Sequence, residues 1–382
     1  MAAHVSNPSL NPTMAHFARR ILLLSLSALV LAACSSVPLP KQAEAPQRVF
    51  YPEAPELPRV QLLATFTGER DFAPQRSGFA TFVAGEAKTQ EMQQVYGVAL
   101  ADGKLYAVDT KGASIAIFDL AQQQFSVFTG SGAGRLKNPI NITVDSDGTK
   151  YITDTSRDQV LLYDRDNKYL GAYGETGQFR PVDVAVAGER LYVVDILHHQ
   201  VQVLNKRSGA LLFKFGKAGS EPGQLYHPTN IAFGPNGDVF ITDTSNFRVQ
   251  RYTAEGKYLR AYGQVGDRPG SFARPKGVAV DREGRVYVSD AAFQNVQVFE
   301  DNGRLLMAFG QPKQGEGMSL PAGVAIDYDH VPLFARYAAP NFKIDYLVIV
   351  ASQIAPNKVE VFGFGKMVGA DYNAPAAGAK SR

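Results

Sequence analysis

The sequence contains little cysteine and little net charge. Cys34 is the only cysteine among 382 residues, so no disulfide can form within the chain. The formal net charge is +3, which is small for this length and does not indicate a nucleic-acid-binding surface. Without disulfides the fold must be stabilised by its apolar core, and the hydrophobic fraction of 45% is sufficient for a large one.

A hydrophobic run long enough to span a membrane is also missing from the N-terminal region. The apolar run from Ile21 to Leu31 follows Arg19 and Arg20 and is too short to cross a bilayer as a lone helix. A basic start followed by a short apolar run is typical of a secretory signal peptide. The segment that begins at Met14 is already a complete signal peptide, so either Met1 or Met14 is a possible start.

The residues that follow this run, LAACS at 31–35, resemble the lipobox of bacterial lipoproteins. The resemblance implies cleavage before Cys34 and attachment of acyl chains such as palmitate to that cysteine, which would anchor the protein stably. Ser35 resembles lipoproteins that are sorted to the outer membrane of the bacterial cell envelope. We expect residues 1–33 to be the signal peptide and residues 34–57, rich in Pro and Ala, to be a flexible tether. The alternative is an ordinary signal peptide that happens to precede a cysteine.

The segment from Pro228 to Gly263 contains four short runs in which apolar and polar residues alternate. Alternation of this kind predicts β-strands, and Asn236-Gly237 between the first two runs favours a tight hairpin turn because Gly and Asn tolerate a positive φ. The segment therefore predicts a four-stranded antiparallel meander, with strands at 230–233, 239–243, 248–252 and 258–262.

Similar segments recur along the chain. The spacing between the aspartates that end the second strand is 41 to 48 residues, which is the range of β-propeller blades. These aspartates are Asp109, Asp154, Asp195, Asp243 and Asp290. The first strand recurs six times, beginning at Gly97, Asn141, Asp183, Asn230, Gly277 and Gly323.

Three patterns recur in these units: P-x-[GN]-[IV]-A, Y-[IV]-[TS]-D-[TA] and [NH]-x-x-V-Q-[VR]-[FY]. They resemble the NHL repeat from residue 96 to about 363. The resemblance implies an all-β fold, a six-bladed β-propeller of four-stranded antiparallel blades over residues 58–366, and leaves residues 367–382 as a disordered tail. The last unit lacks a fourth strand, so we expect the N-terminal strand at 59–67 to complete it and close the ring. NHL propellers include enzymes, RNA binders and protein scaffolds, so the resemblance leaves the function open.

The recurring aspartates could suggest metal sites. An aspartate at a strand end more often accepts hydrogen bonds from the backbone of the turn that follows it. Repetition in successive blades favours this architectural role, because a catalytic site needs asymmetry.

The first strands line the central channel and differ at their entrance. Three adjacent blades carry Asn141, Asp183 and Asn230 where the others carry glycine. Three oxygen-bearing side chains at one level could hold a hard cation such as calcium. Alternatively, they bond to channel water and to neighbouring backbone.

Basic residues stand before the prolines that start consecutive blades. Arg180, His227 and Arg274 should cluster at the channel mouth, with His199 on the same face. This basic arc could bind an anionic ligand or an acidic partner, or its long side chains could pack over the next blade. In NHL-type amidating lyases and related six-bladed lactonases, a metal at this mouth does the chemistry. Here only His199 or His198, together with His227, could share a zinc ion.

The sixth unit has a long aromatic loop, from Tyr328 to Asp345, in place of a tight turn. A long loop on a rigid scaffold is a common docking element, but this one could equally fold back and plug the channel. Its candidate partner-binding residues are Phe334, Tyr337 and Phe342.

The sequence therefore favours a non-catalytic lipoprotein scaffold that is anchored to the membrane and binds another envelope protein. A metal-dependent hydrolase or lyase at the channel mouth is the first alternative. Binding of a small anionic ligand or a glycan is the second. Nucleic acid is not an expected partner.

Overall fold

The computed structural model describes residues 48–72, 89–311, 317–354 and 356–372. The predicted signal peptide, Cys34 and most of the predicted tether lie outside the described residues, as does 373–382. No helix within the described ranges is long and apolar enough to cross a membrane.

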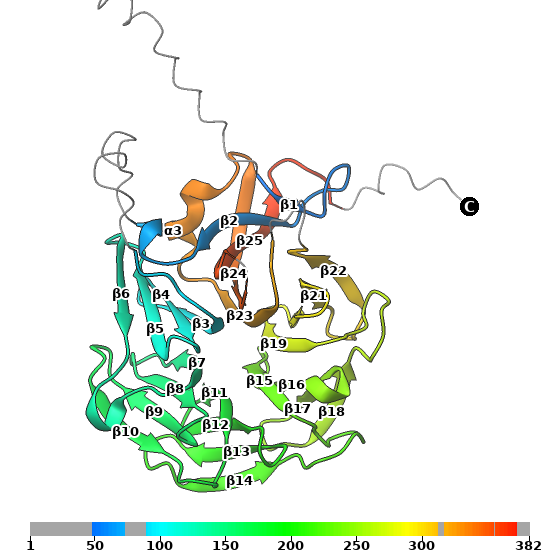
Figure 1. Ribbon diagram of the computed structural model, residues 1–382. Helices are drawn as coiled ribbons and strands as arrows, with labels where there is room; N and C mark the ends of the chain where they lie inside the picture. The colour runs from blue at the N-terminus through cyan, green and yellow to red at the C-terminus, as the bar shows by residue number, and fades with distance from the viewer. Residues whose placement is uncertain (1–47, 73–88, 312–316, 355, 373–382) are drawn as a thin grey trace, which may run out of the picture. The chain divides into compact units, whose positions relative to one another are not determined.

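Six antiparallel sheets surround a central channel, so the predicted six-bladed β-propeller is confirmed (Figure 1). The first strand of each blade is innermost and the fourth is outermost. The strands of blade 4 are β15 (Pro228–Phe233), β16 (Val239–Asp243), β17 (Arg248–Tyr252) and β18 (Tyr258–Tyr262). The last three have the predicted bounds, and the first begins two residues earlier than predicted.

The other regular blades follow the same order. Blade 1 contains β3 (Val95–Ala101), β4 (Lys104–Asp109), β5 (Ser114–Asp119) and β6 (Gln124–Phe128). Blade 2 contains β7 (Pro139–Val144), β8 (Lys150–Asp154), β9 (Gln159–Tyr163) and β10 (Tyr169–Tyr173). Blade 3 contains β11 (Pro181–Ala187), β12 (Arg190–Asp195), β13 (Gln200–Asn205) and β14 (Leu211–Phe215). Blade 5 contains β19 (Pro275–Val280), β20 (Val286–Asp290), β21 (Asn295–Phe299) and β22 (Leu305–Phe309).

Blade 6 is built from both ends of the described chain. Its order is β1-β2-β25-β24-β23, and β2 pairs antiparallel with β25 from Val60↔Phe364 to Phe66↔Val359. The N-terminal strand therefore closes the ring, as predicted. The strands are β1 (Phe50–Tyr51), β2 (Val60–Phe66), β23 (Pro321–Asp327), β24 (Phe342–Ser352) and β25 (Val359–Met367).

The folded part extends beyond the predicted range of 58–366. β1 lies within the segment expected to be a tether and adds a fifth strand to blade 6 by pairing with β2. At the other end, the Tyr372 hydroxyl donates to the Pro58 carbonyl at 2.7 Å. The Arg59 guanidinium lies 3.9 Å from the centroid of the Tyr372 ring. The two ends of the described chain are thus fastened to each other.

The turn at Asn236-Gly237 differs from the predicted two-residue hairpin. Gly234 N–H donates to the Asp238 carbonyl, and Gly237 has a φ of 80°. The loop is therefore three residues long, with Gly237 in the left-handed region. Pro235 explains the difference, because its fixed negative φ suits a type I turn that is completed by a left-handed glycine.

The core lies between blades. Apolar side chains of β2, β24 and β25 form one cluster with those of β3, β4 and β5, so blade 6 packs against blade 1. Within it the rings of Phe66 and Phe118 are 5.0 Å apart. The N-terminal strand consequently contributes both hydrogen bonds and apolar contacts to the closed ring.

Short helices occupy some of the connections. They are η1 (Glu69–Asp71), η2 (Gly132–Gly134), η3 (Thr244–Asn246), α3 (Val331–Phe334) and η4 (Ala335–Tyr337). The last two belong to the long loop of blade 6.

Candidate functional site

The face on which the second strands end, here called the loop face, is organised by the recurring aspartates. Asp290 accepts hydrogen bonds from the backbone N–H groups of Ala292 and Phe293 in its own turn, at 2.9 and 3.0 Å. Asp154 and Asp195 accept equivalent bonds. The predicted role in turn structure is confirmed for these blades.

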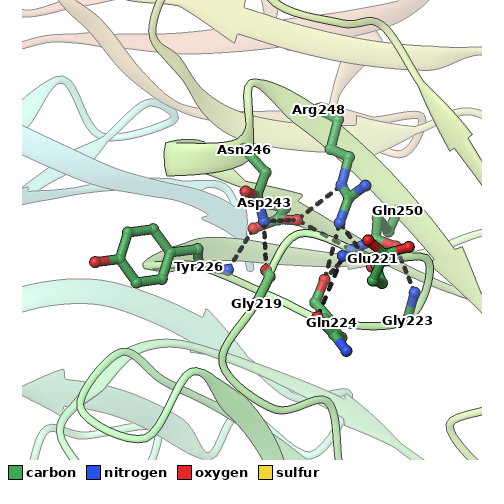
Figure 2. A network of polar contacts seen from close by, with 9 residues as sticks. All are labelled: Gly219, Glu221, Gly223, Gln224, Tyr226, Asp243, Asn246, Arg248 and Gln250. Carbon is green, nitrogen blue, oxygen red and sulfur yellow. Dashed lines mark hydrogen bonds and ion pairs between the residues drawn. The ribbon is translucent and has the colours of Figure 1, made fainter.

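The same carboxylates also fix the connection that enters each blade, which sequence reasoning missed. Figure 2 shows Asp243, which accepts a bond from the backbone N–H of Tyr226 at 2.6 Å and bonds from the side chains of Asn246, Arg248 and Gln250. In blades 1, 2 and 5 the corresponding backbone donors are Gln93, Lys137 and Ala273, each followed by a second donor at the next residue. In blade 3 the donor is Arg180. The aspartates therefore hold the backbone beneath or beside the predicted basic arc.

Blades 3 to 5 add a glutamine to this arrangement. The Gln250 amide donates to Asp243 and to the Gln224 carbonyl, which ties the incoming loop to the blade. Gln202 and Gln297 make the corresponding bonds to loop carbonyls. Blade 6 lacks this arrangement, because Ser352 and Glu360 take the places of the aspartate and the glutamine.

Three positions at the start of each inner strand define three rings of residues at the channel mouth, with one residue from each blade in each ring. The upper ring is Gln94, Asn138, Arg180, His227, Arg274 and Leu320. The middle ring is Tyr96, Ile140, Val182, Thr229, Lys276 and Ala322. The lower ring is Gly97, Asn141, Asp183, Asn230, Gly277 and Gly323.

The glycines of the lower ring are required by close backbone approach. A Cβ on Gly97 would overlap Asn141, and a Cβ on Gly277 or Gly323 would overlap the backbone of the next inner strand. The inner strands of blades 5, 6 and 1 therefore approach their neighbours too closely for a side chain at this level. The polar side chains of the lower ring all come from blades 2 to 4.

The polar residues of the lower ring bond to one another and to backbone. Asp183 accepts from the N–H groups of Val184 and Ile231 at 2.8 and 3.0 Å, and from the Asn230 amide at 3.1 Å. Burial raises the pKa of Asp183 to about 7. Asn141 Oδ1 accepts from the N–H of the next residue. Because Asn230 presents a donor to Asp183, the three side chains as arranged do not offer converging oxygens to a calcium ion.

Tyr96 crosses the channel above this ring. Its hydroxyl, from blade 1, lies 3.5 Å from Asn230 Oδ1 on blade 4, the opposite side of the ring. Below it, a cavity of about 340 Å³ is lined by the inner strands from Asn141, Asp183 and Asn230 to Asp327. The cavity thus extends toward the opposite face, here called the turn face, and Tyr96 lies across its upper end.

His199 and His227 are brought together, as the sequence suggested. Their ring centroids are 4.7 Å apart, and His199 Nδ1 accepts the backbone N–H of His227 at 3.0 Å. This bond leaves the proton of neutral His199 on Nε2, so that nitrogen cannot bind a metal while the bond is present. Burial, followed by the nearby His227, lowers the pKa of His199 and favours the neutral form.

His198 contacts an aspartate of its own turn. Its Nδ1 contacts Asp195 Oδ2 at 2.7 Å. Within the described ranges, no three His, Cys, Asp or Glu side chains gather as a metal-binding group.

The basic arc is only partly assembled. Arg180 forms an ion pair with Asp158 at 3.6 Å, and His227 Nδ1 contacts the Ser245 hydroxyl at 3.1 Å. Arg274 forms no ion pair with any described residue. Lys276 on the middle ring is a further cation at the mouth that sequence reasoning missed, as was Tyr96. Comparing the second residue of the inner strand in each blade could have found both, because they are the exceptions in a small, mostly apolar set.

The long loop of blade 6 folds back onto blade 1. Phe334 and Phe342 are 1% and 5% exposed and lie in or beside the core, whereas Tyr337 is 39% exposed. His330 Nε2 accepts the backbone N–H of Gly103 at 2.9 Å, and Gln61 bonds to the backbone of Tyr337 and Ala339. Of the three candidate docking residues, only Tyr337 is accessible.

Comparison with known proteins agrees with this architecture. The NHL repeat family model matches residues 225–252 and 272–299. The Protein brain tumor of Drosophila melanogaster is 34% identical over 88 residues, which is 22% of this chain and 8% of that protein. The chain therefore spans less than a tenth of this curated relative.

Solved structures that resemble the chain include enzymes. A gluconolactonase from Xanthomonas campestris has a TM-score of 0.52 at 16% identity, covering 71% of this chain and 86% of its own. A virginiamycin B lyase from Staphylococcus aureus has a TM-score of 0.50 at 13% identity, with coverage of 71% and 94%. At these identities the likeness shows the fold alone. The chain is a six-bladed β-propeller that contains NHL repeats in blades 4 and 5.

Proposed function

We propose that the chain is a lipid-anchored binding protein of a bacterial cell envelope, which holds another envelope protein against its loop face. The observation that carries this proposal is an exposed aromatic cluster, defined by His199, Tyr226 and His227. Tyr226 is 44% exposed, and Leu197, in the same turn as His199, is 39% exposed.

The cluster is exposed but held in place. The backbone of Tyr226 is fixed by Asp243, and its ring stacks on His199 with a centroid distance of 4.9 Å. The ring of His227 lies 4.4 Å from that of Tyr226. A tyrosine that is already ordered loses little conformational entropy on binding, and Tyr is enriched among residues that dominate interface energies. These properties suit a partner-binding surface.

Anchoring is proposed through Cys34, with the residues that follow it acting as a tether and the outer membrane as the location. In the native organism, we expect the wild-type protein to sediment with membranes and to incorporate a labelled fatty acid. Cys34→Ala should abolish both signals. Equal labelling of the two proteins would contradict the anchor.

The docking site is tested by matched substitutions on opposite faces. Tyr226→Ser removes the loop-face tyrosine, and Tyr337→Ser removes a similarly exposed tyrosine of the long loop. We expect cross-linking in native membranes to lose the dominant partner, by about tenfold in yield, for Tyr226→Ser only. Loss with Tyr337→Ser alone would place docking on the long loop instead.

Metal content measured on the same purified sample tests the catalytic alternative. One tightly held equivalent of a divalent ion, together with no captured partner, would favour a hydrolase or lyase at the channel mouth.

A further inference from the structure

We propose that the channel mouth binds a small oxyanion, a carboxylate or a phosphate, through Lys276 and Arg274 of blade 5. This site is independent of the protein partner proposed above. It shares Arg274 with the predicted arc and differs from it by including Lys276 of the middle ring.

The charged residues of the upper and middle rings are all basic. Neither the upper nor the middle ring contains an acidic residue. Arg180 of the upper ring is compensated by Asp158. Among the described residues, by contrast, no carboxylate forms an ion pair with Lys276 or with Arg274. Two neighbouring cations without a counter-charge attract an anion.

The single acid of the lower ring does not supply that counter-charge. Both oxygens of Asp183 already accept hydrogen bonds from backbone or from Asn230. Burial also shifts its pKa to about 7, so part of the population is uncharged near neutral pH. None of the three rings therefore supplies a counter-charge for Lys276 or Arg274.

Lys276 is half-buried and forms no ion pair with any described residue. Its neighbours in the middle ring include Thr229, whose hydroxyl donates to the Lys276 carbonyl at 3.2 Å. Burial, followed by repulsion from Arg274, lowers the pKa of Lys276 to about 8. A bound anion would relieve both effects, because it would replace lost hydration and offset the like charge.

Arg274 and Lys276 flank Pro275, the first residue of β19, so the two cations start the same inner strand. Repulsion between them contributes to the lowered pKa of Lys276. The backbone N–H of Arg274 is held by Asp290 at 3.0 Å, so the start of β19 is fixed. One guanidinium and one half-buried ammonium at the start of a single strand make a site for one small oxyanion rather than an extended polyanion.

The first test measures amine labelling of the full-length protein at pH 8 by mass spectrometry. We expect Lys276 to react readily, and succinate or inorganic phosphate to slow its labelling by at least about fivefold. Lys257, an exposed lysine on the turn face, serves as the internal control and should label equally with and without anion. Protection by succinate alone would identify a carboxylate site, and protection by phosphate alone a phosphate site. Unchanged labelling of Lys276 with both anions would overturn the proposal.

The second test measures binding of the protecting anion by calorimetry. Lys276→Met should weaken binding by about 10- to 100-fold, since it removes a charge-assisted hydrogen bond, while Lys257→Met should not. Wild-type binding should weaken as the pH rises from 7 to 9 and Lys276 loses its proton. Lys276→Arg should keep its affinity at pH 9, because a guanidinium stays charged. A purely structural role for Lys276 would not produce this difference in pH dependence.

Discussion

At the scale of single residues, Glu360 is the most informative departure from the repeat. It occupies the position of Gln297 in blade 5, and Ser352 occupies that of Asp290. No described residue bonds to Glu360 Oε2 or to Ser352 Oγ, although both side chains are buried. Burial raises the pKa of Glu360 to about 8.

This shift predicts a pH-dependent stability. A carboxyl that holds its proton more tightly in the folded than in the unfolded protein stabilises the fold most below its unfolded pKa of 4.5. Glu360 alone should therefore lower the free energy of unfolding by on the order of 4 kcal/mol as the pH rises from about 4.5 to about 8. Denaturant unfolding at pH 5 and pH 8 measures the difference.

Glu360→Gln should remove the contribution of Glu360 and make the protein more stable at pH 8. Asp183, whose pKa is raised to about 7, shifts stability in the same direction by a comparable amount, so a slope should remain up to about pH 7. Glu175→Gln, at an exposed position, is the control and should behave as the wild type. A wild-type protein whose stability does not change between pH 5 and pH 8 would contradict the buried neutral carboxyl.

The same scale shows what sequence reasoning could not reach. The repeat predicted the role of the recurring aspartates in the turns that follow them, because those hydrogen bonds involve only residues close in sequence. Tyr96 of blade 1 contacts Asn230 of blade 4, and this contact depends on which blades lie opposite each other in the closed ring. The position of Lys276 at the channel mouth likewise depends on the closed ring. Phe334 and Phe342 read as exposed loop aromatics, since the sequence does not indicate that their loop packs on blade 1.

At the scale of elements, β2 holds blade 6 to blade 1. It pairs with β25, and Phe66 packs against Phe118 of blade 1. Deleting residues 48–67 should therefore destabilise the entire propeller, with the loss of a single cooperative transition in thermal unfolding. Deleting residues 373–382 is the control and should leave the melting temperature within about 2 °C. A deletion of 48–67 that melts like the full chain would show that closure does not need β2.

The long loop of blade 6 makes a second contact with blade 1. His330 bridges Asp327 and the backbone N–H of Gly103, at 2.8 and 2.9 Å. His330→Ala should lower the free energy of unfolding by about 1–3 kcal/mol, because the part-buried N–H of Gly103 loses its acceptor. His198→Ala also removes a histidine that contacts an aspartate, but one without a bond to another blade, so it should cost less. Denaturant titration compares the two, and equal losses would argue against a cross-blade role.

Element boundaries were predictable where the repeat is regular. The strands of blade 4 agree with the alternation in the sequence, and the glycines and prolines mark the turns. The departures lie at the two ends. β1 falls in a Pro- and Glu-containing stretch that has no strand pattern, and its pairing with β2 is decided by the closed sheet rather than by local preference.

At the scale of the whole molecule, the ring is less symmetric than its repeats suggest. Glycines draw together the inner strands of blades 5, 6 and 1, whereas blades 2 to 4 carry polar side chains at the same level. The loop-face aromatic cluster lies on blades 3 and 4, and the proposed oxyanion site on blade 5. Both proposals therefore concern neighbouring blades of one face, and each can fail without the other.

The closure of blade 6 by β2 also determines which blade can be completed last during folding. β2 and β25 are nearly the whole folded chain apart in sequence, so bringing them together costs roughly 3 kcal/mol more entropy than forming a ten-residue hairpin. Each of the five regular blades can form from a continuous segment of chain. β2 is synthesised before all five regular blades but must wait for β25, and until then the apolar edges of blades 1 and 6 stay uncovered. The interval between synthesis and closure is when the protein is most vulnerable to aggregation and proteolysis.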